Sequence, residues 1–290
     1  MNAGRRPVVA SLEDALAGIG DGAVIGLGGA VTAAHPMALV RGLARRPIHD
    51  VRIVAPTGGI DVDLLIAAGC VASVTSSYVG VEGLAGVVPV FRAAVQAGTV
   101  EVIDLDEAHC VMGLRAAGHK LPFLPWRGGV GTSVPELNPR LIAFDDPVAG
   151  QPLLAIPAIE LDVALIYAEQ ADEFGNVQVI GTPHMDQLLA NAAERVIVQV
   201  ERIVSTETIR AAPERTMYWR DVTVVRAPFG THPYSNGWLT ADETHLREFL
   251  AAAREGEAGL NGYLDRYVHT ADHDGYLEAI GIRRLTSLMV

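Results

Sequence analysis

Short runs of β-branched residues alternate along this 290-residue chain with alanine- and leucine-rich stretches of helical periodicity. The predicted strands are Ala23–Leu27, Val51–Ala55, Ala72–Ser76, Val100–Ile103, Val163–Tyr167, Arg195–Val200 and Val222–Arg226. The predicted helices are Ser11–Ala17, Pro36–Ala44, Asp61–Ala68, Pro89–Ala97, Cys110–Ala117 and His184–Ala193. Several strands are apolar on both faces, which is typical of buried strands in a largely parallel sheet. The alternation therefore predicts an α/β fold with helices on both faces of the sheet.

A glycine-rich turn, Ile25-Gly26-Leu27-Gly28-Gly29-Ala30, joins a predicted strand to a predicted helix. Glycines at such a turn let backbone N–H groups approach an anion or a carbonyl oxygen, because no Cβ stands in the way. The spacing lacks the third glycine and the later acidic residue of a dinucleotide fingerprint, and no Gly-Lys-Ser/Thr follows as in a phosphate loop. The turn predicts a small-molecule site at a strand end.

The overall charge and the cysteine count exclude several classes of function. A net charge of −12 argues against nucleic acid or an anionic membrane as a main partner. The only two cysteines, Cys70 and Cys110, lie in separate apolar segments and fit reduced intracellular thiols better than a disulfide framework. The sequence has neither an apolar signal core near its start nor a run long enough to span a bilayer. We expect a cytoplasmic protein.

Residues 1–290 are expected to form a single domain with a charged, helical C-terminal extension from about residue 239. In the middle of the chain, prolines and glycines follow one another closely in the segment Leu121–Thr132, which predicts a long loop. Long loops in compact domains are usually functional.

Two motifs have simple structural interpretations beside functional ones. Asp172 and the pair Gly175-Asn176 are typical of a tight turn, while a metal site at Asp172 and Glu173 lacks recognisable ligand spacing. His232 lies between prolines and glycines, where a hydrogen-bonding brace is favoured over a catalytic base. No metal site is expected.

Glu107 is the carboxylate of greatest interest, because it follows a predicted strand and opens a predicted helix. Acidic residues favour the first turn of any helix, since they oppose its macrodipole. Position alone therefore does not make Glu107 catalytic. A serine nucleophile in a Gly-x-Ser-x-Gly elbow is absent, so hydrolase chemistry of that kind is unsupported.

Several segments, in this order, resemble those of one enzyme family. They are Gly26-x-Gly28-Gly29, Ser77-Tyr78-Val79-Gly80, Gly128–Thr132, Ala171–Asn176, Val200–Val204, Ala227–Pro233 and His273–Leu277. With this order and spacing the chain resembles the A (alpha) subunit of family I CoA-transferases, and the last segments are most similar to the glutaconate CoA-transferase branch. The resemblance covers nearly the whole chain.

The resemblance implies a three-layer α/β/α architecture with an open, mostly parallel sheet, and an A/B heteromer. It implies coenzyme A as a substrate with no covalently bound cofactor, together with acyl-CoA and carboxylate substrates. A glutamate of the B subunit would attack the thioester, so this chain would lack the nucleophile, and its glycine turn would face the thioester with a backbone donor for developing negative charge. The expected substrate-binding residues are Gly26, Gly28, Gly29, Ser77, Tyr78, Gly80, Gly129 and Gly131.

One departure from the family pattern concerns Glu107, which stands where many members have a glutamine. A carboxamide can donate a hydrogen bond to an oxyanion, whereas an ionised carboxylate can only accept one or act as a base. With a glutamate at position 107 the segment is similar to that of the alpha subunit of steroid-degradation hydrolases, which open a ring of a CoA-linked diketone. Transfer, hydrolysis with Glu107 as general base, and a non-catalytic scaffold or isomerase-like role are the alternatives that the sequence leaves open.

Overall fold

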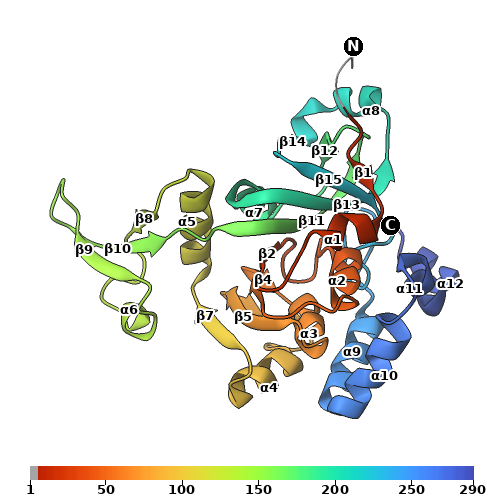
Figure 1. The fold of residues 1–290 in the computed structure, drawn as a ribbon, viewed down its shortest axis with the longest axis horizontal. Helices are drawn as coiled ribbons and strands as arrows, with labels where there is room; N and C mark the ends of the chain where they lie inside the picture. Colours follow the sequence, from red (N-terminus) through yellow and green to blue (C-terminus); the bar gives the residue numbers. More distant parts are fainter. Residues whose placement is uncertain (1–5) are drawn as a thin grey trace.

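The computed structural model describes residues 6–290, and eight parallel strands form the centre of the molecule (Figure 1). Their spatial order is β1 (Val9–Ala10), β15 (Val222–Arg226), β13 (Ala193–Ile203), β11 (Leu161–Ala171), β2 (Val24–Leu27), β3 (Val51–Val54), β5 (Val71–Ser76) and β7 (Glu101–Asp104). Short antiparallel strands β12 (Val177–Gln178) and β14 (Thr216–Met217) extend the sheet beyond β11. The expected mostly parallel α/β sheet is confirmed.

Alternate residues of the central strand β11 enter two different cores. Val163 and Leu165 pack on one face, and Ala164 and Ile166 pack on the other. The first core is covered by α1 (Leu12–Ala17), α2 (Met37–Ala44), α3 (Ile60–Ala67), α4 (Pro89–Ala97), α9 (Glu243–Arg254) and α10 (Glu257–Tyr267). The second is covered by α5 (Glu107–Gly118) and α7 (Asp186–Ala192). Strands apolar on both faces are thus buried between two helical layers.

The segment after α5 corrects the expected long loop. Phe123–Trp126 is the strand β8, which pairs with β10 (Pro152–Pro157), and β10 pairs with β9 (Ile142–Asp145). The prolines of this segment are tolerated because β8 is an edge strand, and only the remainder to Thr132 is irregular.

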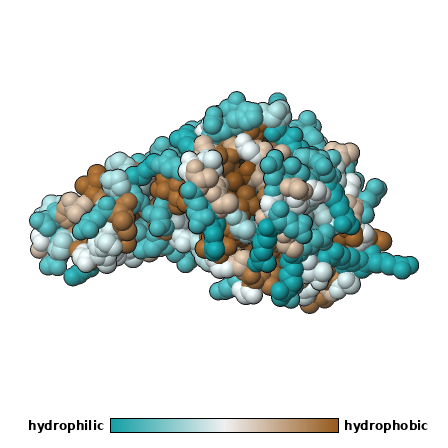
Figure 2. All heavy atoms as spheres, turned by 90° about the horizontal axis from the view of Figure 1, so that it is seen from below, coloured by the Kyte–Doolittle hydropathy of each residue, from teal (hydrophilic) through white to brown (hydrophobic). Residues whose placement is uncertain are grey.

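This small sheet and the short helix α6 (Val134–Leu137) form an arm that projects from the body (Figures 1 and 2). Exposed apolar side chains lie on the arm, including Leu137, Ile142 and Val148 at 81%, 62% and 93% exposure. In Figure 2 the arm is a narrow extension on which brown, apolar atoms lie among teal ones.

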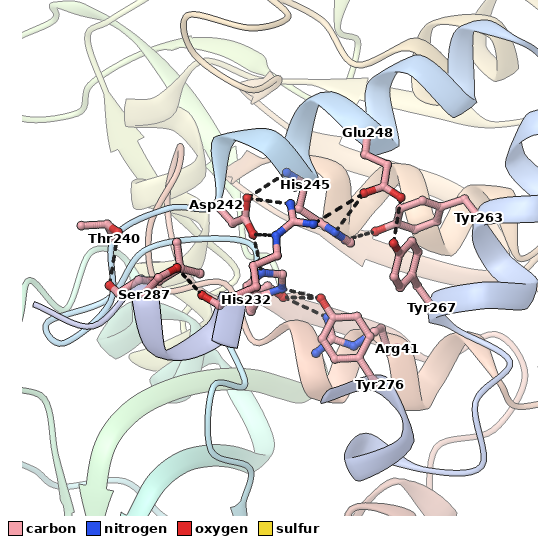
Figure 3. Close-up of polar contacts among 12 residues, drawn as sticks. Arg41, His232, Thr240, Asp242, His245, Glu248, Tyr263, Tyr267, Tyr276 and Ser287 are labelled. Carbon is pink, nitrogen blue, oxygen red and sulfur yellow. Dashed lines mark hydrogen bonds and ion pairs between the residues drawn. The ribbon is translucent and has the colours of Figure 1, made fainter. Parts of the chain in front are cut away.

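The C-terminal helices α9, α10, α11 (His273–Ile280) and α12 (Ile282–Ser287) are joined to the body by a buried polar cluster (Figure 3). Asp242 accepts hydrogen bonds from Arg284 Nε at 2.5 Å and Nη2 at 2.9 Å, and its Oδ2 lies 3.1 Å from His232 Nε2. His232 Nδ1 is 2.6 Å from Tyr276 Oη. Arg41 of α2 lies over the Tyr276 ring and donates to the His232 carbonyl. The bracing interpretation of His232 is confirmed.

The remaining short elements are β4 (Thr57–Gly58), β6 (Tyr78–Val79), α8 (Thr206–Arg210) and a 3-10 helix, Pro213–Arg215. Asp172 Oδ1 accepts the N–H groups of Phe174 and Asn176, so the predicted tight turn is confirmed. Within the described part of the chain, no helix is long and apolar enough to cross a membrane.

Candidate active site

The carboxyl ends of parallel strands meet at one edge of the sheet, and most of the predicted site residues lie at or just after these ends. The glycine turn follows β2, Ser77 and Tyr78 follow β5, and Glu107 follows β7. The register aligns Gly26 with Val54 on β3, which continues through β5 and β7. The edge is where an open α/β sheet binds its ligands.

The glycine turn is packed tightly against the protein itself. Gly28 N–H donates to the Leu165 carbonyl at 2.9 Å, and Gly29 N–H donates to Asp186 Oδ1 at 2.9 Å. Gly29 has φ +86°, and a Cβ there would lie 2.6 Å from the His35 nitrogen. A Cβ on Gly28 would lie 2.5 Å from Asp186 Oδ1. The turn needs glycine for these close approaches, and both donors already have partners within the chain.

Gly26 has a different reason to be glycine. It lies within β2, paired with Ala164 and Val54 on the neighbouring strands. A Cβ at this position would meet Leu161 Cδ1 at 2.7 Å and Leu189 Cδ2 at 3.1 Å. The absent side chain lets α7 pack closely over the strand.

The Ser77–Gly80 segment contains the short strand β6, which pairs with β4 in the turn after β3. Ser77 Oγ donates to the Pro56 carbonyl at 2.6 Å, and Gly80 N–H donates to the Gly58 carbonyl at 3.0 Å. Tyr78 folds over Gly80, where a Cβ would lie 2.4 Å from its hydroxyl. Burial, with Glu82 nearby, raises the pKa of the Tyr78 phenol. The segment therefore presents a neutral phenol at the sheet edge.

Glu107 is the first residue of α5 and is exposed. The helix begins three residues before the predicted start because Asp106 caps it, accepting the His109 N–H at 2.7 Å. Buried His109 places its Nε2 3.1 Å from the Gly128 carbonyl, and a Cβ on Gly129 would lie 3.3 Å from His109 Cε1. His109 thus holds the glycine loop beside the helix start, a link that the sequence did not indicate.

Gly129 and Gly131 both have positive φ, +90° and +77°. A Cβ on Gly131 would meet no heavy atom within 4 Å, so that residue is required by conformation alone. The loop that carries them lies beside Glu107, which follows β7. The glycine turn follows β2, and the strands β3 and β5 lie between β2 and β7 in the sheet. The predicted residues are therefore spread along one edge.

A cavity of about 240 Å³ lies behind the glycine turn and contains acids that sequence reasoning missed. Tyr167 and Glu169 of β11 and Asp186 of α7 line it and are 2%, 2% and 1% exposed. Burial raises the pKa of Asp186 to about 8, with Glu169 adding to the shift and the Gly29 N–H opposing it. The strand was expected to end at Tyr167, and a carboxylate two residues later in an apolar strand was the available signal.

Glu201 lies beside Glu169 on the neighbouring strand β13, as the pairing of Gln170 with Arg202 requires. Burial raises its pKa to about 7, although backbone N–H groups of Phe229 and Gly230 oppose the shift. Among residues 6–290, no group of three or more histidine, cysteine or acidic side chains is arranged to hold a metal ion.

A buried hydrogen bond between His35 and Asp61 supports the segment that follows the glycine turn. His35 Nδ1 lies 2.8 Å from Asp61 Oδ2, and Asp61 Oδ1 accepts the Gly59 N–H at 2.6 Å. The His35 ring stacks on Tyr234 with 4.1 Å between centroids. Asp61 is the second residue of α3, and its contacts connect the turn after β3 to the segment that follows the glycine turn.

A family model described as coenzyme A transferase matches residues 9–220, more than half of the chain. The protein belongs to the coenzyme A transferase family. The structure of glutaconate CoA-transferase from Acidaminococcus fermentans is similar, with a TM-score of 0.91 and 30% identity over 98% of this chain and 96% of that one. The A (alpha) chain of that enzyme is also 30% identical in sequence, so the protein is an alpha-type member with the predicted three-layer fold.

Two further relatives are not named as transferases, and one of them is much longer than this chain. The cholesterol ring-cleaving hydrolase IpdA subunit of Mycobacterium tuberculosis is 32% identical, covering 91% of this chain and 94% of that protein. An uncharacterized protein of Archaeoglobus fulgidus is 36% identical over 93% of this chain, which spans only 62% of that relative's length. Transferase-type and hydrolase-type relatives are both present.

Proposed function

We propose that this chain is the alpha (A) subunit of a heteromeric CoA-transferase that moves coenzyme A between an acyl-CoA thioester and a carboxylic acid. The observation that carries the proposal is the likeness to the alpha subunit of glutaconate CoA-transferase, which extends over 97% of this chain and 94% of that protein. The glycine turn, the Ser77–Gly80 segment and the start of the Glu107 helix lie along one edge of the sheet, which supports the proposal.

The nucleophile in this proposal is a glutamate of a partner B subunit. Its carboxylate attacks the thioester carbon, expels CoA thiolate and forms a mixed anhydride. The thiolate then attacks the glutamyl carbonyl, which releases the donor acid and leaves CoA on the glutamate. The acceptor carboxylate repeats these steps in reverse and departs as the new thioester.

This chain contributes the opposite wall of the site. The start of α5 and the Gly128–Thr132 loop present a helix N-terminus and backbone groups to developing negative charge. Gly28 and Gly29 donate to Leu165 and Asp186, so we assign the glycine turn to shaping the acyl end of the site instead of to oxyanion stabilisation. Coenzyme A acts as a substrate, and no covalent cofactor is needed.

Co-expression with the B subunit provides the direct test. The purified A/B complex should exchange CoA between a labelled acyl-CoA and a free acid, with a rate that depends on the acceptor acid. Free CoA released into water without acceptor dependence would contradict transfer. The buried, unpaired cysteines fit a reducing compartment, and we propose that the reaction is cytoplasmic.

The carboxylate at position 107 and the IpdA relative favour a second candidate, a ring-opening acyl-CoA hydrolase with Glu107 as general base. Glu107→Gln separates the two candidates, because removing a general base costs about a hundredfold to ten-thousandfold. A transferase that uses the partner's glutamate should stay within about tenfold of the parent rate.

Glu257→Gln is the matched control, since Glu257 is also an exposed first residue of a helix. It removes the same favourable interaction with a helix N-terminus, but at α10, where the chain packs against α9. Any loss of rate shared by the two variants reports on folding alone. A complex that neither exchanges nor hydrolyses thioesters would favour the scaffold alternative.

A further inference from the structure

The cavity behind the glycine turn is built from segments that are far apart in the sequence. Ala33 and Ala34 follow the turn, Tyr167 and Glu169 project from the end of β11, and Asp186 comes from the start of α7. Residues from the segments 179–184 and 235–237 close the remaining sides. Asp186 touches both the cavity and the Gly29 N–H, so the cavity is directly continuous with the turn.

Two polar groups in the cavity are placed to meet a ligand. The Tyr167 hydroxyl is buried, with the side chains of Glu201 and Asn236 within its reach. Glu169 accepts the Ile180 N–H at 2.8 Å through Oε2 only. Alternate residues of a strand point to the same side, so Tyr167 and Glu169 face the cavity together. A buried hydroxyl needs hydrogen-bond partners, and a ligand hydroxyl at this position would supply one.

Two glycines keep the space in front of Glu169 open. A Cβ on Gly181 would lie 3.4 Å from Glu169 Oε1, and a Cβ on Gly237 would lie 3.1 Å from it. Any larger side chain at either position would cover the carboxylate oxygen. Both glycines are exposed, so this oxygen is at the inner end of an opening.

The charges around the cavity select against anions. Its ionisable lining consists of Tyr167, Glu169, Asp186 and His184, without a lysine or arginine among the described lining residues. Burial, with His35 nearby, lowers the pKa of His184, which keeps the imidazole neutral at neutral pH. Glu201 adds a further carboxyl group behind Glu169. A bound carboxylate would lie beside the Glu169 carboxyl group with no basic side chain to pair with it.

We propose that this cavity receives the distal end of a short, uncharged acyl group that carries a hydroxyl, which donates to Glu169 and accepts from Tyr167. This inference rests on the proposed function, because the glycine turn then lies at the acyl end of the thioester. A cavity of about 240 Å³ is smaller than the pockets of about 300–1,000 Å³ that hold drug-sized ligands, so it suits a short acyl group. Acyl groups with a distal carboxylate, as in dicarboxylic acids, are excluded by charge.

Three CoA thioesters with four-carbon acyl groups test the inference in the A/B complex: 3-hydroxybutyryl-CoA, butyryl-CoA and succinyl-CoA, each with acetate as acceptor. A hydrogen bond to a charged group makes 3-hydroxybutyryl-CoA better than butyryl-CoA by about tenfold to a hundredfold in kcat/KM. Succinyl-CoA should be the poorest donor. Equal kcat/KM for the three thioesters, or a preference for succinyl-CoA, would overturn the inference.

Two variants assign the preference to the cavity. Tyr167→Phe should lower kcat/KM for 3-hydroxybutyryl-CoA by more than it changes kcat/KM for butyryl-CoA, while Glu169→Gln should also raise kcat/KM for succinyl-CoA. Glu194→Gln is the control, because Glu194 is exposed at the opposite, amino-terminal end of β13. If either cavity variant fails to fold, the other decides, and an unchanged order of donors in a folded variant refutes the assignment.

Failure of the proposed function gives a different result. The complex would then exchange CoA with none of the three thioesters, and equilibrium binding of the same three compounds replaces the rate measurement. Tighter binding of 3-hydroxybutyryl-CoA that is lost in Glu169→Gln would support the cavity even so. Equal binding of all three would overturn it.

Discussion

Asp186→Asn should make the protein more stable at neutral pH, although it removes a buried side chain that accepts a hydrogen bond. The asparagine keeps the shape of the aspartate and an oxygen that can accept the Gly29 N–H, which now donates to Oδ1 at 2.9 Å. What the variant removes is an ionisable group that is 1% exposed and lies near a second carboxylate, Glu169. The expected gain in the free energy of unfolding comes from removing this ionisable group.

The magnitude follows from the pKa of Asp186, which burial raises from 3.8 to about 8 in the folded protein. Between these values the folded chain holds the proton and the unfolded chain does not, so stability falls as pH rises through this window. Each pH unit costs about 1.4 kcal/mol, which amounts to on the order of 4 kcal/mol at pH 7. The stability that depends on the protonated Asp186 carboxyl is fully present below about pH 4 and is lost as pH approaches about 8.

Urea unfolding at pH 5, 6, 7 and 8 measures the effect, with Asp145→Asn as the control at an exposed position on the arm. The free energy of unfolding of Asp186→Asn should exceed that of the parent by a margin that widens with pH, while the control should stay within about 0.5 kcal/mol. Parallel stability curves for the parent and Asp186→Asn would refute the argument. A natural protein that keeps such a costly acid indicates a functional role for it.

Three further predictions concern the turn, the C-terminal helices and the cysteines. Gly29→Ala should destabilise the protein by about 1–3 kcal/mol more than Gly22→Ala in urea unfolding, because both have positive φ but only the Cβ at position 29 meets backbone atoms; equal losses would contradict this. Arg284→Met should cost about 1–3 kcal/mol at pH 7. Burial opposes the shift, but hydrogen bonds from His232 and Arg284 hold the pKa of Asp242 below its usual range. The stability that the ionised Asp242 contributes is therefore lost as pH falls, and Arg284→Met should lose less stability on acidification than the parent. An equally steep fall in the free energy of unfolding of both proteins at acid pH would contradict this. Burial raises the pKa of the Cys110 thiol to about 12, so an aromatic disulfide reagent at pH 8 should react with it only after unfolding, and rapid modification of native protein would contradict its burial.

The parallel sheet could be predicted because its signal is local. Val163–Ile166 is apolar at every position, and only a strand covered by helices on both faces can bury such a run. The order of strands along the sheet was not accessible in the same way, since it depends on long-range pairing such as Gly26 with both Val54 and Ala164.

The cavity acids escaped prediction for a physical reason. Carboxylates are rarely buried, so Glu169 seemed to lie beyond the end of its strand, although β11 continues to Ala171. Asp186 falls within the predicted helix His184–Ala193, and only the folded chain brings its carboxylate to the Gly29 N–H. Tertiary packing decides both positions. The prolines near Phe123–Trp126 likewise indicated a loop where an edge strand forms.

In the proposed function this chain forms half of an active site, and the nucleophile belongs to its partner. Incubating the A/B complex with an acyl-CoA and then with borohydride reduces a glutamyl-CoA thioester to the alcohol, and peptide mass spectrometry locates the reduced residue. We expect a reduced glutamate on the partner and no modification of this chain, with Glu107 intact. Reduction at Glu107 or at another carboxylate of this chain would contradict it.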